Sequence, residues 1–184
     1  MEPQIDAPVF GALADLGWFY EFVFAKVPKH GRIVASQPAM SASSIKPEQL
    51  RNLKCLGKLN DEERAAFLEF VEPASCEQNT VLFEEGSSGN CMYLILEGQM
   101  RVFTRKKGKI VPLTILEAGD AFGDIAMFHG TPRLASVDAL RDTRLLKLTA
   151  SGLKEMTAKC PDLSTALLSS LATSLSQMYQ HFRH

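Results

Sequence analysis

The sequence predicts an α+β domain in which an eight-stranded antiparallel β-roll lies between N-terminal and C-terminal helices. Two observations support this prediction. From residue 74 to residue 148, short apolar runs are separated by glycines, and regular short strands with glycine turns favour a sandwich or a barrel. On both sides of this region apolar residues recur with the period of a helix, and the last such segment is rich in leucine.

Six strands are predicted directly from their apolar residues. They are Thr80–Phe83, Met92–Leu96, Met100–Arg105, Ile110–Leu116, Ala135–Leu140 and Arg144–Leu148, and turns are expected at Gly86, Gly89, Gly98, Gly108 and Gly119. Arg105, Lys106, Lys107 and Lys109 form a basic cluster at one predicted hairpin tip. For this cluster we favour a solvated turn over a patch for an acidic partner.

Helices are predicted before the strands, in residues 46–72. Asn60, with Glu63 three residues later, resembles a capping box, which satisfies free N–H groups at a helix start. The residue before a proline is disfavoured in a helix, so Pro73 should end this helical region.

A short helix is predicted near Gly152 to Ala158, and Pro161 with Asp162 should open a long C-terminal helix. Leu168, Leu171, Leu175, Met178 and Phe182 alternate steps of three and four residues along it. This is an a/d-type seam, which could pair two copies of the chain or could lie on the barrel.

The first 45 residues are predicted to form an aromatic helix followed by a linker. Six aromatic residues lie between residues 10 and 24, and Pro28–Ser44 has the composition of a linker. The helix could pack on its own domain, bind a partner or lie on a membrane surface. Asp15, Glu21 and Lys26 interrupt its apolar character and argue against a membrane-spanning segment.

Composition excludes several classes of protein. The net charge of −1 has no electrostatic footprint for nucleic acid, and Glu2 and Asp6 have the wrong charge for a signal peptide. The four cysteines are widely separated, and neither they nor the histidines show zinc-site spacing. We therefore expect reduced thiols, no metal and a cytoplasmic location.

The chemistry of a binding site is concentrated in residues 122–137. Phe122 to Phe128 is long enough for one or two helical turns, whose free N–H groups suit an anion. Gly123 would let the backbone approach a ligand closely, because it has no Cβ. Asp124 and Arg133 bracket this helix, and a guanidinium is a planar fork of donors suited to a phosphate. The pair could bind a sugar hydroxyl and a phosphate together.

This segment, F-G-D-I-A-M-F-H-G-T-P-R-L-A-S-V, resembles the phosphate-binding cassette of cyclic nucleotide-binding domains. The runs L-F-E-E-G at residues 82–86 and Y-L-I-L-E-G at residues 93–98 resemble the early strands of that family. The resemblance covers about residues 50–182 and implies a jelly-roll-like double-stranded β-helix. The implied domain is 46–184: helices 46–72, β-roll 73–149 with its cassette at 122–137, and C-terminal helices 150–184.

The resemblance also implies a role for each residue of the ligand-binding set. Asp124 takes the place of a family glutamate that accepts the ribose 2′-hydroxyl, and Arg133 matches the phosphate-binding arginine. The backbone N–H groups of Ala126 and Leu134 match donors to the phosphate, and Tyr179 lies near where the family covers the base. Gly123, Ile125 and Ala135 complete the expected set.

Two departures from the family pattern matter. Asp124 is one methylene shorter than glutamate, so its ribose contact could lengthen or go through water. Leu134 stands where several cyclic GMP-binding relatives carry a hydroxyl residue, which favours cyclic AMP. Met178 and Tyr179 replace polar helix residues that touch adenine in catabolite-activator proteins, so base preference is weakly determined.

The resemblance implies a regulatory module that binds cyclic AMP in preference to cyclic GMP and signals through its C-terminal helix to a protein partner. A homodimer through that helix is expected. The alternative is a degenerate relative that binds no nucleotide and serves as a dimerisation or interaction module. An enzyme of cupin-like chemistry would need a metal set, but His30 and His129 are isolated, so no enzyme and no cofactor are expected. No winged helix follows the long helix, so no DNA partner is expected. No membrane partner is expected either.

Overall fold

The computed structural model describes residues 45–57 and 59–181, with side chains described as far as residue 173. The aromatic helix and linker predicted at the N-terminus therefore lie outside the described residues, up to residue 44. The same holds for Phe182 of the predicted seam.

Helices precede and follow the strands, as predicted, and one short helix lies among them. They are the 3-10 helices η3 (Pro47–Asn52), η4 (Lys54–Leu56) and η5 (Leu68–Phe70), and the α-helices α2 (Asp61–Phe67), α3 (Asp124–His129), α4 (Ala150–Lys159) and α5 (Pro161–His181). The strands are β1 (Val71–Cys76), β2 (Val81–Phe83), β3 (Cys91–Glu97), β4 (Gln99–Lys106), β5 (Lys109–Glu117), β6 (Ala121–Phe122), β7 (Ser136–Ala139) and β8 (Thr143–Thr149).

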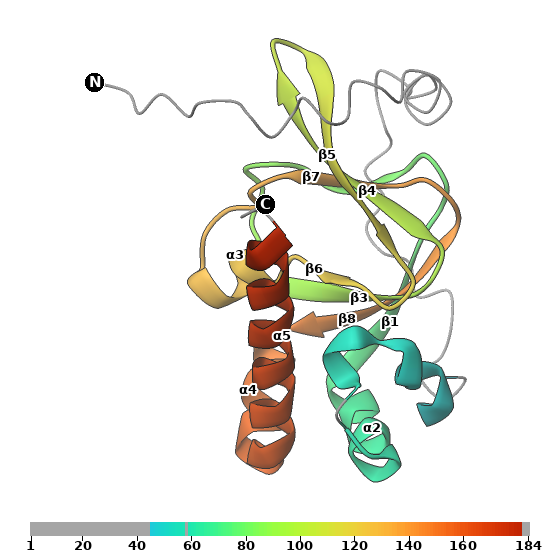
Figure 1. The fold of residues 1–184 in the computed structure, drawn as a ribbon, viewed down its shortest axis with the longest axis vertical. Coiled ribbons are helices and arrows are strands. Elements are labelled where there is room, and N and C mark those ends of the chain that lie inside the picture. The colour runs from blue at the N-terminus through green and yellow to red at the C-terminus, as the bar shows by residue number, and fades with distance from the viewer. Residues whose placement is uncertain (1–44, 58, 182–184) are drawn as a thin grey trace. The chain divides into compact units, whose positions relative to one another are not determined.

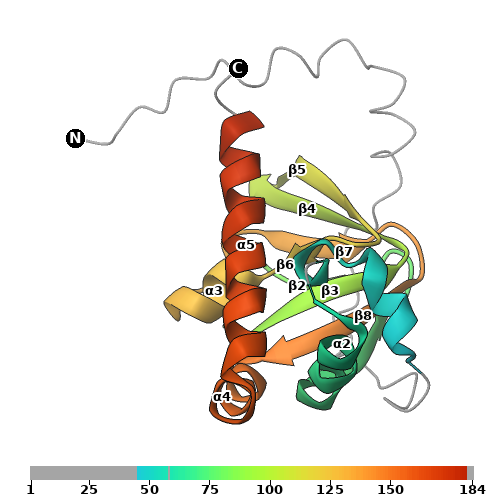
Figure 2. The same ribbon diagram turned by 60° about the horizontal axis from the view of Figure 1, so that its bottom comes forward.

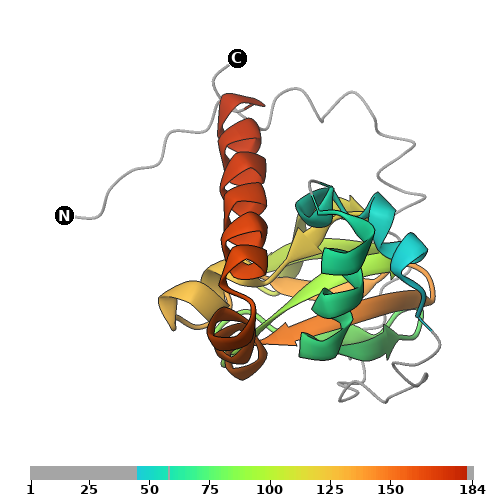
Figure 3. The same ribbon diagram turned by 90° about the horizontal axis from the view of Figure 1, so that it is seen from below.

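These strands form two four-stranded antiparallel sheets, in the orders β1-β8-β3-β6 and β2-β7-β4-β5. In Figure 1 the two sheets face each other, α2 and α4 lie below the β3–β8 sheet, and α5 rises from α4 past the end of that sheet. The turned views in Figures 2 and 3 show that α2 and the pair α4–α5 occupy the same side of that sheet. The predicted α+β fold with an antiparallel β-roll between helices is confirmed.

The β3–β8 sheet has a core on each of its faces. Alternate residues of a strand point to opposite faces, so Met92 and Leu94 pack toward the helices, whereas Tyr93 and Ile95 face the interior of the roll. The helix-side core includes Leu167 of α5. The candidate segment 122–137 borders the interior face, because Phe122 pairs with Tyr93 in the β3–β6 ladder.

The predicted capping box is confirmed at the start of α2. The Glu63 N–H donates to Asn60 Oδ1 at 2.9 Å, and the Asn60 N–H donates to Glu63 Oε2 at 2.8 Å. The expectation that Pro73 ends the helical region needs a correction, because Pro73 lies inside β1 and opposite Leu146. Strand β1 is at the edge of its sheet, where a residue without an N–H is tolerated.

The predicted seam on the C-terminal helix also needs a correction, at the two seam residues whose side chains are described. Leu171 is buried in the helix-side core, but Leu168 is 43% exposed, so these two residues do not share one buried face. The buried stripe of α5 is Leu163, Leu167 and Leu171, four residues apart, and it packs toward η4. No helix within residues 45–57 and 59–181 is long and apolar enough to cross a membrane.

Candidate functional site

The candidate cassette begins where β6 ends. Gly123 adopts φ +81°, a left-handed conformation that an L side chain rarely takes, and α3 begins at the next residue. A Cβ on Gly123 would lie 2.6 Å from Arg133 Nη1 and 3.3 Å from the Cys91 carbonyl oxygen. Position 123 therefore requires glycine for its conformation and for its close approach to Arg133.

Arg133 is buried, with 5% of its surface exposed. Its Nη1 donates to the Gly123 carbonyl at 2.8 Å, and its Nη2 donates to Cys91 Sγ at 3.3 Å. Its guanidinium carbon lies 4.1 Å from the centroid of the Phe83 ring, a cation–π distance. The side chain is thus held by three elements that are distant in sequence.

The backbone of Arg133 is fixed as well as its side chain. Its N–H donates to the Ser87 carbonyl at 2.8 Å, and its carbonyl accepts from the Gly86 N–H at 2.8 Å. These two bonds join the cassette to the turn between β2 and β3. The turn and the cassette therefore form one unit around the arginine.

Within the part of the chain that the structure describes, no carboxylate pairs with Arg133, and its Nε–H has no hydrogen-bond partner. Burying a charge without a counter-charge costs roughly several kcal/mol of free energy. Buried polar groups are also almost always hydrogen-bonded. An oxyanion would supply both the missing charge and the missing acceptor.

Gly89 is a further member of the site. It lies just before β3, and a Cβ there would overlap the Ala126 Cβ and come within 3.1 Å of Arg133 Cδ and Nε. Its absence lets α3 and the arginine side chain meet at this point. The sequence indicated only a turn at this glycine, since nothing in its neighbours signals a contact with residues 37 and 44 positions away.

An aromatic cluster lies beside the guanidinium. The rings of Phe83, Tyr93 and Phe122 have centroids 5.5 to 6.2 Å apart. Burial raises the pKa of Tyr93 above its ordinary value, a hydrogen bond with Cys91 adds to the rise, and the nearby charge of Arg133 opposes it. The phenol therefore stays neutral at physiological pH.

The structure places the predicted set as follows. Asp124 is half-buried at the first position of α3, and its charge contributes to raising the pKa of Cys55, after the larger effect of burial. Ala126 is buried and Ala135 is half-buried. The side chains of Ile125 and Leu134 are 42% and 64% exposed.

Tyr179 lies on α5, but its side chain is outside the described residues. The structure therefore brings Gly123, Ala126 and Arg133 into one cluster. It adds Phe83, Gly89 and Cys91 to that cluster, which the sequence alone did not indicate. Phe83 was predicted only as a strand residue and Cys91 only as a reduced thiol, and their role in the site depends on strand pairing.

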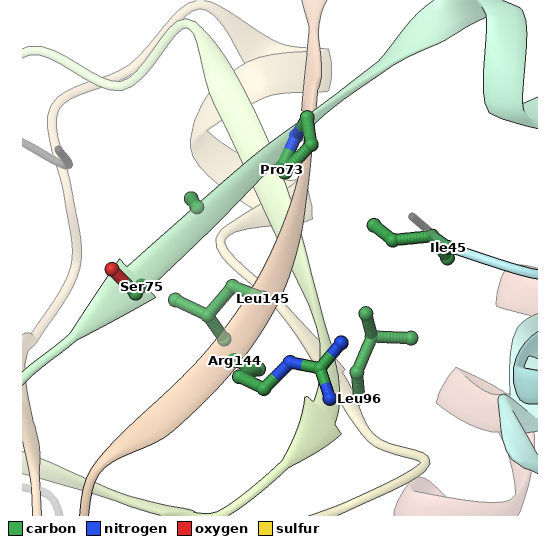
Figure 4. Close-up of a pocket in the computed structure, with 7 residues that line it drawn as sticks. Ile45, Pro73, Ser75, Leu96, Arg144 and Leu145 are labelled. Atoms are coloured by element: carbon green, nitrogen blue, oxygen red, sulfur yellow. The ribbon is translucent and has the colours of Figure 1, made fainter. Parts of the chain in front are cut away.

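A hollow lies away from the cassette, beside β1 and β8. It encloses about 250 Å³, partly open to solvent, and Figure 4 shows the Arg144 side chain beside Leu96 and near Ile45. Arg144 pairs with Glu97 at 3.3 Å, so this cation already has a partner. Within residues 45–57 and 59–181, no group of three or more His, Cys, Asp or Glu side chains could hold a metal.

Two antiparallel sheets, with an arginine-containing segment between β6 and β7, define the chain as a β-roll domain. Residues 73–160 match the family model of the cyclic nucleotide-binding domain. Residues 73–160 of this chain therefore resemble a cyclic nucleotide-binding domain.

Individual proteins show the same likeness. The chain is 29% identical over 112 residues to a CRP-like cAMP-activated global transcriptional regulator of Mycobacterium tuberculosis, covering 60% of this chain and 50% of that protein. It is 29% identical over 114 residues to a cAMP-dependent protein kinase regulatory subunit of Aspergillus fumigatus, covering 62% of this chain and 27% of that protein. The chain thus spans half or less of these relatives.

A solved structure agrees with these matches. The crystal structure of a cyclic nucleotide-binding domain from Methylobacillus flagellatus superposes with a TM-score of 0.65 at 25% identity, covering 73% of this chain and 76% of that one. The resemblance inferred from residues 122–137 is therefore confirmed at the level of family and fold.

Proposed function

We propose that this domain is a non-enzymatic regulatory module that binds a cyclic mononucleotide, with Arg133 as the phosphate-binding side chain. The observation that carries the proposal is the buried guanidinium, which has no carboxylate partner in the described chain and an unpartnered Nε–H. A cyclic phosphate carries one negative charge and oxygens that accept the remaining N–H donors. Charge-assisted hydrogen bonds of this kind contribute about 1.5–3 kcal/mol each.

Cyclic AMP is the proposed ligand, in preference to cyclic GMP. Two relatives named for cyclic AMP, a regulator and a kinase regulatory subunit, support this choice. Leu134, next to Arg133, carries no hydroxyl with which to bind a guanine. We assign the ribose contact to Asp124, which is half-buried at the first position of α3. The backbone N–H groups of Ala126 and Leu134 are the proposed additional donors to the phosphate.

Calorimetric titration of cyclic AMP and cyclic GMP tests the proposal. Arg133→Gln should weaken cyclic AMP binding about tenfold to a hundredfold, because at least one charge-assisted bond is lost. Arg144→Gln is the matched control, since Arg144 lines the distant hollow and should leave affinity unchanged. Equal affinity of the Arg133→Gln variant and the wild type would contradict the proposed role.

The contribution of Asp124 has its own measurement. Asp124→Ala should lower affinity for cyclic AMP more than for its 2′-deoxy analogue, because only the former presents the hydroxyl. Asp124→Glu restores the family residue and should keep or raise affinity. If wild type binds both ligands equally well, the carboxylate does not serve the ribose.

We further propose that α5 transmits the ligand signal to a partner. Met127 of α3 belongs to the same core cluster as Leu163 and Leu167 of α5, so a change at the cassette can reach this helix. A base stacked on Tyr179 would bias α5 by about tenfold, given roughly 0.5–1.5 kcal/mol for an aromatic contact. Hydrogen exchange of residues 163–182 with cyclic AMP should slow in wild type and less so in Tyr179→Ala. Tight binding with unchanged exchange would refute the mechanism.

Association through α5 is the remaining part of the proposal. Leu168 presents an apolar side chain on the exposed side of the helix, which supports pairing of two copies there. Light scattering should show a dimer at high micromolar concentration, and Leu168→Glu should return it to a monomer. A monomeric wild type at that concentration would exclude this dimer.

A further inference from the structure

We propose that Phe83 is a positioning residue for Arg133: its ring fixes the plane of the guanidinium and thereby sets the affinity of the anion site. This inference rests on the proposed function, since it concerns the same arginine. It extends the site to β2, a strand 50 residues before Arg133 in the sequence.

Three contacts restrict the orientation of the Arg133 guanidinium. The Phe83 ring, 4.1 Å away, limits the tilt of the guanidinium plane. The bonds to the Gly123 carbonyl and to Cys91 Sγ limit rotation within that plane. Two of the five guanidinium donors take part in these bonds, so three remain for a ligand, the Nε–H among them.

The ring that supports Arg133 is itself held in place. Phe83 contacts Tyr93 with centroids 6.2 Å apart and Phe122 with centroids 6.0 Å apart. Phe122 directly precedes Gly123, whose carbonyl accepts from Arg133. The ring and the carbonyl that orient the guanidinium are therefore positioned by the same short strand, β6.

This arrangement favours binding because the arginine needs little ordering when a ligand arrives. Association otherwise loses free energy for each long side chain that must be immobilised. A desolvated cation over an aromatic face is also stabilised, which helps to hold the charge where no carboxylate of the described residues pairs with it. An aliphatic side chain at position 83 could fill the same space but would not provide a flat polarisable face.

The competing explanation is that Phe83 only packs the interior of the roll. Phe83 and Val102 are both partly buried residues packed against the same interior core cluster. Only Phe83 has a ring over the guanidinium of Arg133. If packing alone matters, replacing either residue should lower stability and leave ligand affinity unchanged.

A double-mutant cycle measured by calorimetry with cyclic AMP separates these explanations. Phe83→Leu should weaken binding about tenfold, as expected for loss of a desolvated cation–π contact. Phe83→Met provides a second aliphatic variant of similar size, and melting temperatures verify that each variant is folded. Val102→Ala is the matched control and should bind like wild type. In the Arg133→Gln background, Phe83→Leu should change the dissociation constant by less than about twofold.

Three outcomes would overturn the inference. Unchanged affinity in folded Phe83→Leu and Phe83→Met variants would show that the ring does not position Arg133, while leaving the proposed function intact. An equal loss with and without Arg133 would show that Phe83 acts through packing. A wild-type chain that binds no cyclic nucleotide would reject the proposed function and this inference with it.

Discussion

Gly89→Ala is a test of whether the turn before β3 shapes the candidate site. Gly89 does not have the positive φ that would exclude a side chain, so alanine fits the backbone there. Its Cβ does not fit the space, because it would overlap the Ala126 Cβ and reach 3.1 Å from Arg133 Nε. Carbon atoms pack at about 3.5–4.0 Å, so α3 and the turn must separate by roughly 1 Å.

Two effects of this separation can be measured. Overpacking of this kind costs about 1–3 kcal/mol of folding free energy, which lowers the melting temperature by roughly 3–10 °C in a domain of this size. Moving α3 also displaces Ala126, whose backbone N–H is a proposed phosphate donor, from Arg133, and should weaken the proposed phosphate contact. Such a loss corresponds to about a tenfold or greater rise in the dissociation constant for cyclic AMP.

Gly108→Ala is the control for this experiment. Gly108 lies in the β4–β5 turn with φ +77°, and nothing lies within 4 Å of a Cβ placed there. Alanine should therefore cost roughly 1–2 kcal/mol of backbone strain with no steric overlap, and the change is outside the cassette. Thermal unfolding and calorimetry of both variants are the assays. If Gly89→Ala binds cyclic AMP as tightly as Gly108→Ala does, the assignment of Gly89 to the site is wrong.

The structure supports three further predictions about stability. Asp138→Asn should lower the unfolding free energy by about 3–5 kcal/mol in urea denaturation, because it breaks the buried ion pair with Arg101; a change below about 1 kcal/mol would contradict this. Burial raises the pKa of Cys55 to about 12 and that of Cys76 to about 11. The thiols of the unfolded chain therefore ionise first, and the unfolding free energy should fall as pH rises from about 9 to 12. A constant unfolding free energy over this range would refute the prediction. Asn60→Ala should cost about 1 kcal/mol through loss of the helix cap, measured by thermal unfolding, whereas Asn60→Asp should not.

Local sequence signals were sufficient for much of the architecture. The capping residues of α2, the turns at glycines and the six apolar runs all correspond to observed elements, because each depends on residues only a few positions apart. Strand β1 was missed because Pro73 is a helix and strand breaker in most contexts, and only its position at a sheet edge makes it acceptable. The two-residue strand β6 is too short to have a periodicity of its own.

The apolar seam of α5 shows a different limit. Residues three and four positions apart are equally compatible with one face of a helix, so the sequence could not distinguish Leu167 from Leu168 as the buried position. Packing against η4 selects Leu167 and leaves Leu168 exposed. Periodicity predicts that a helix has an apolar face, but the partner element decides which residues form it.

The sequence by itself determined where the candidate site lies and which family the domain resembles, because the cassette from Phe122 to Val137 is one continuous segment whose chemistry can be read residue by residue. Only the tertiary structure decided the environment of Arg133. Its burial, its free Nε–H, and its contacts with Phe83, Gly89 and Cys91 arise from strands and turns that are brought together by antiparallel pairing. Contacts between segments some forty to fifty residues apart depend on strand register, which no local pattern of residue types specifies.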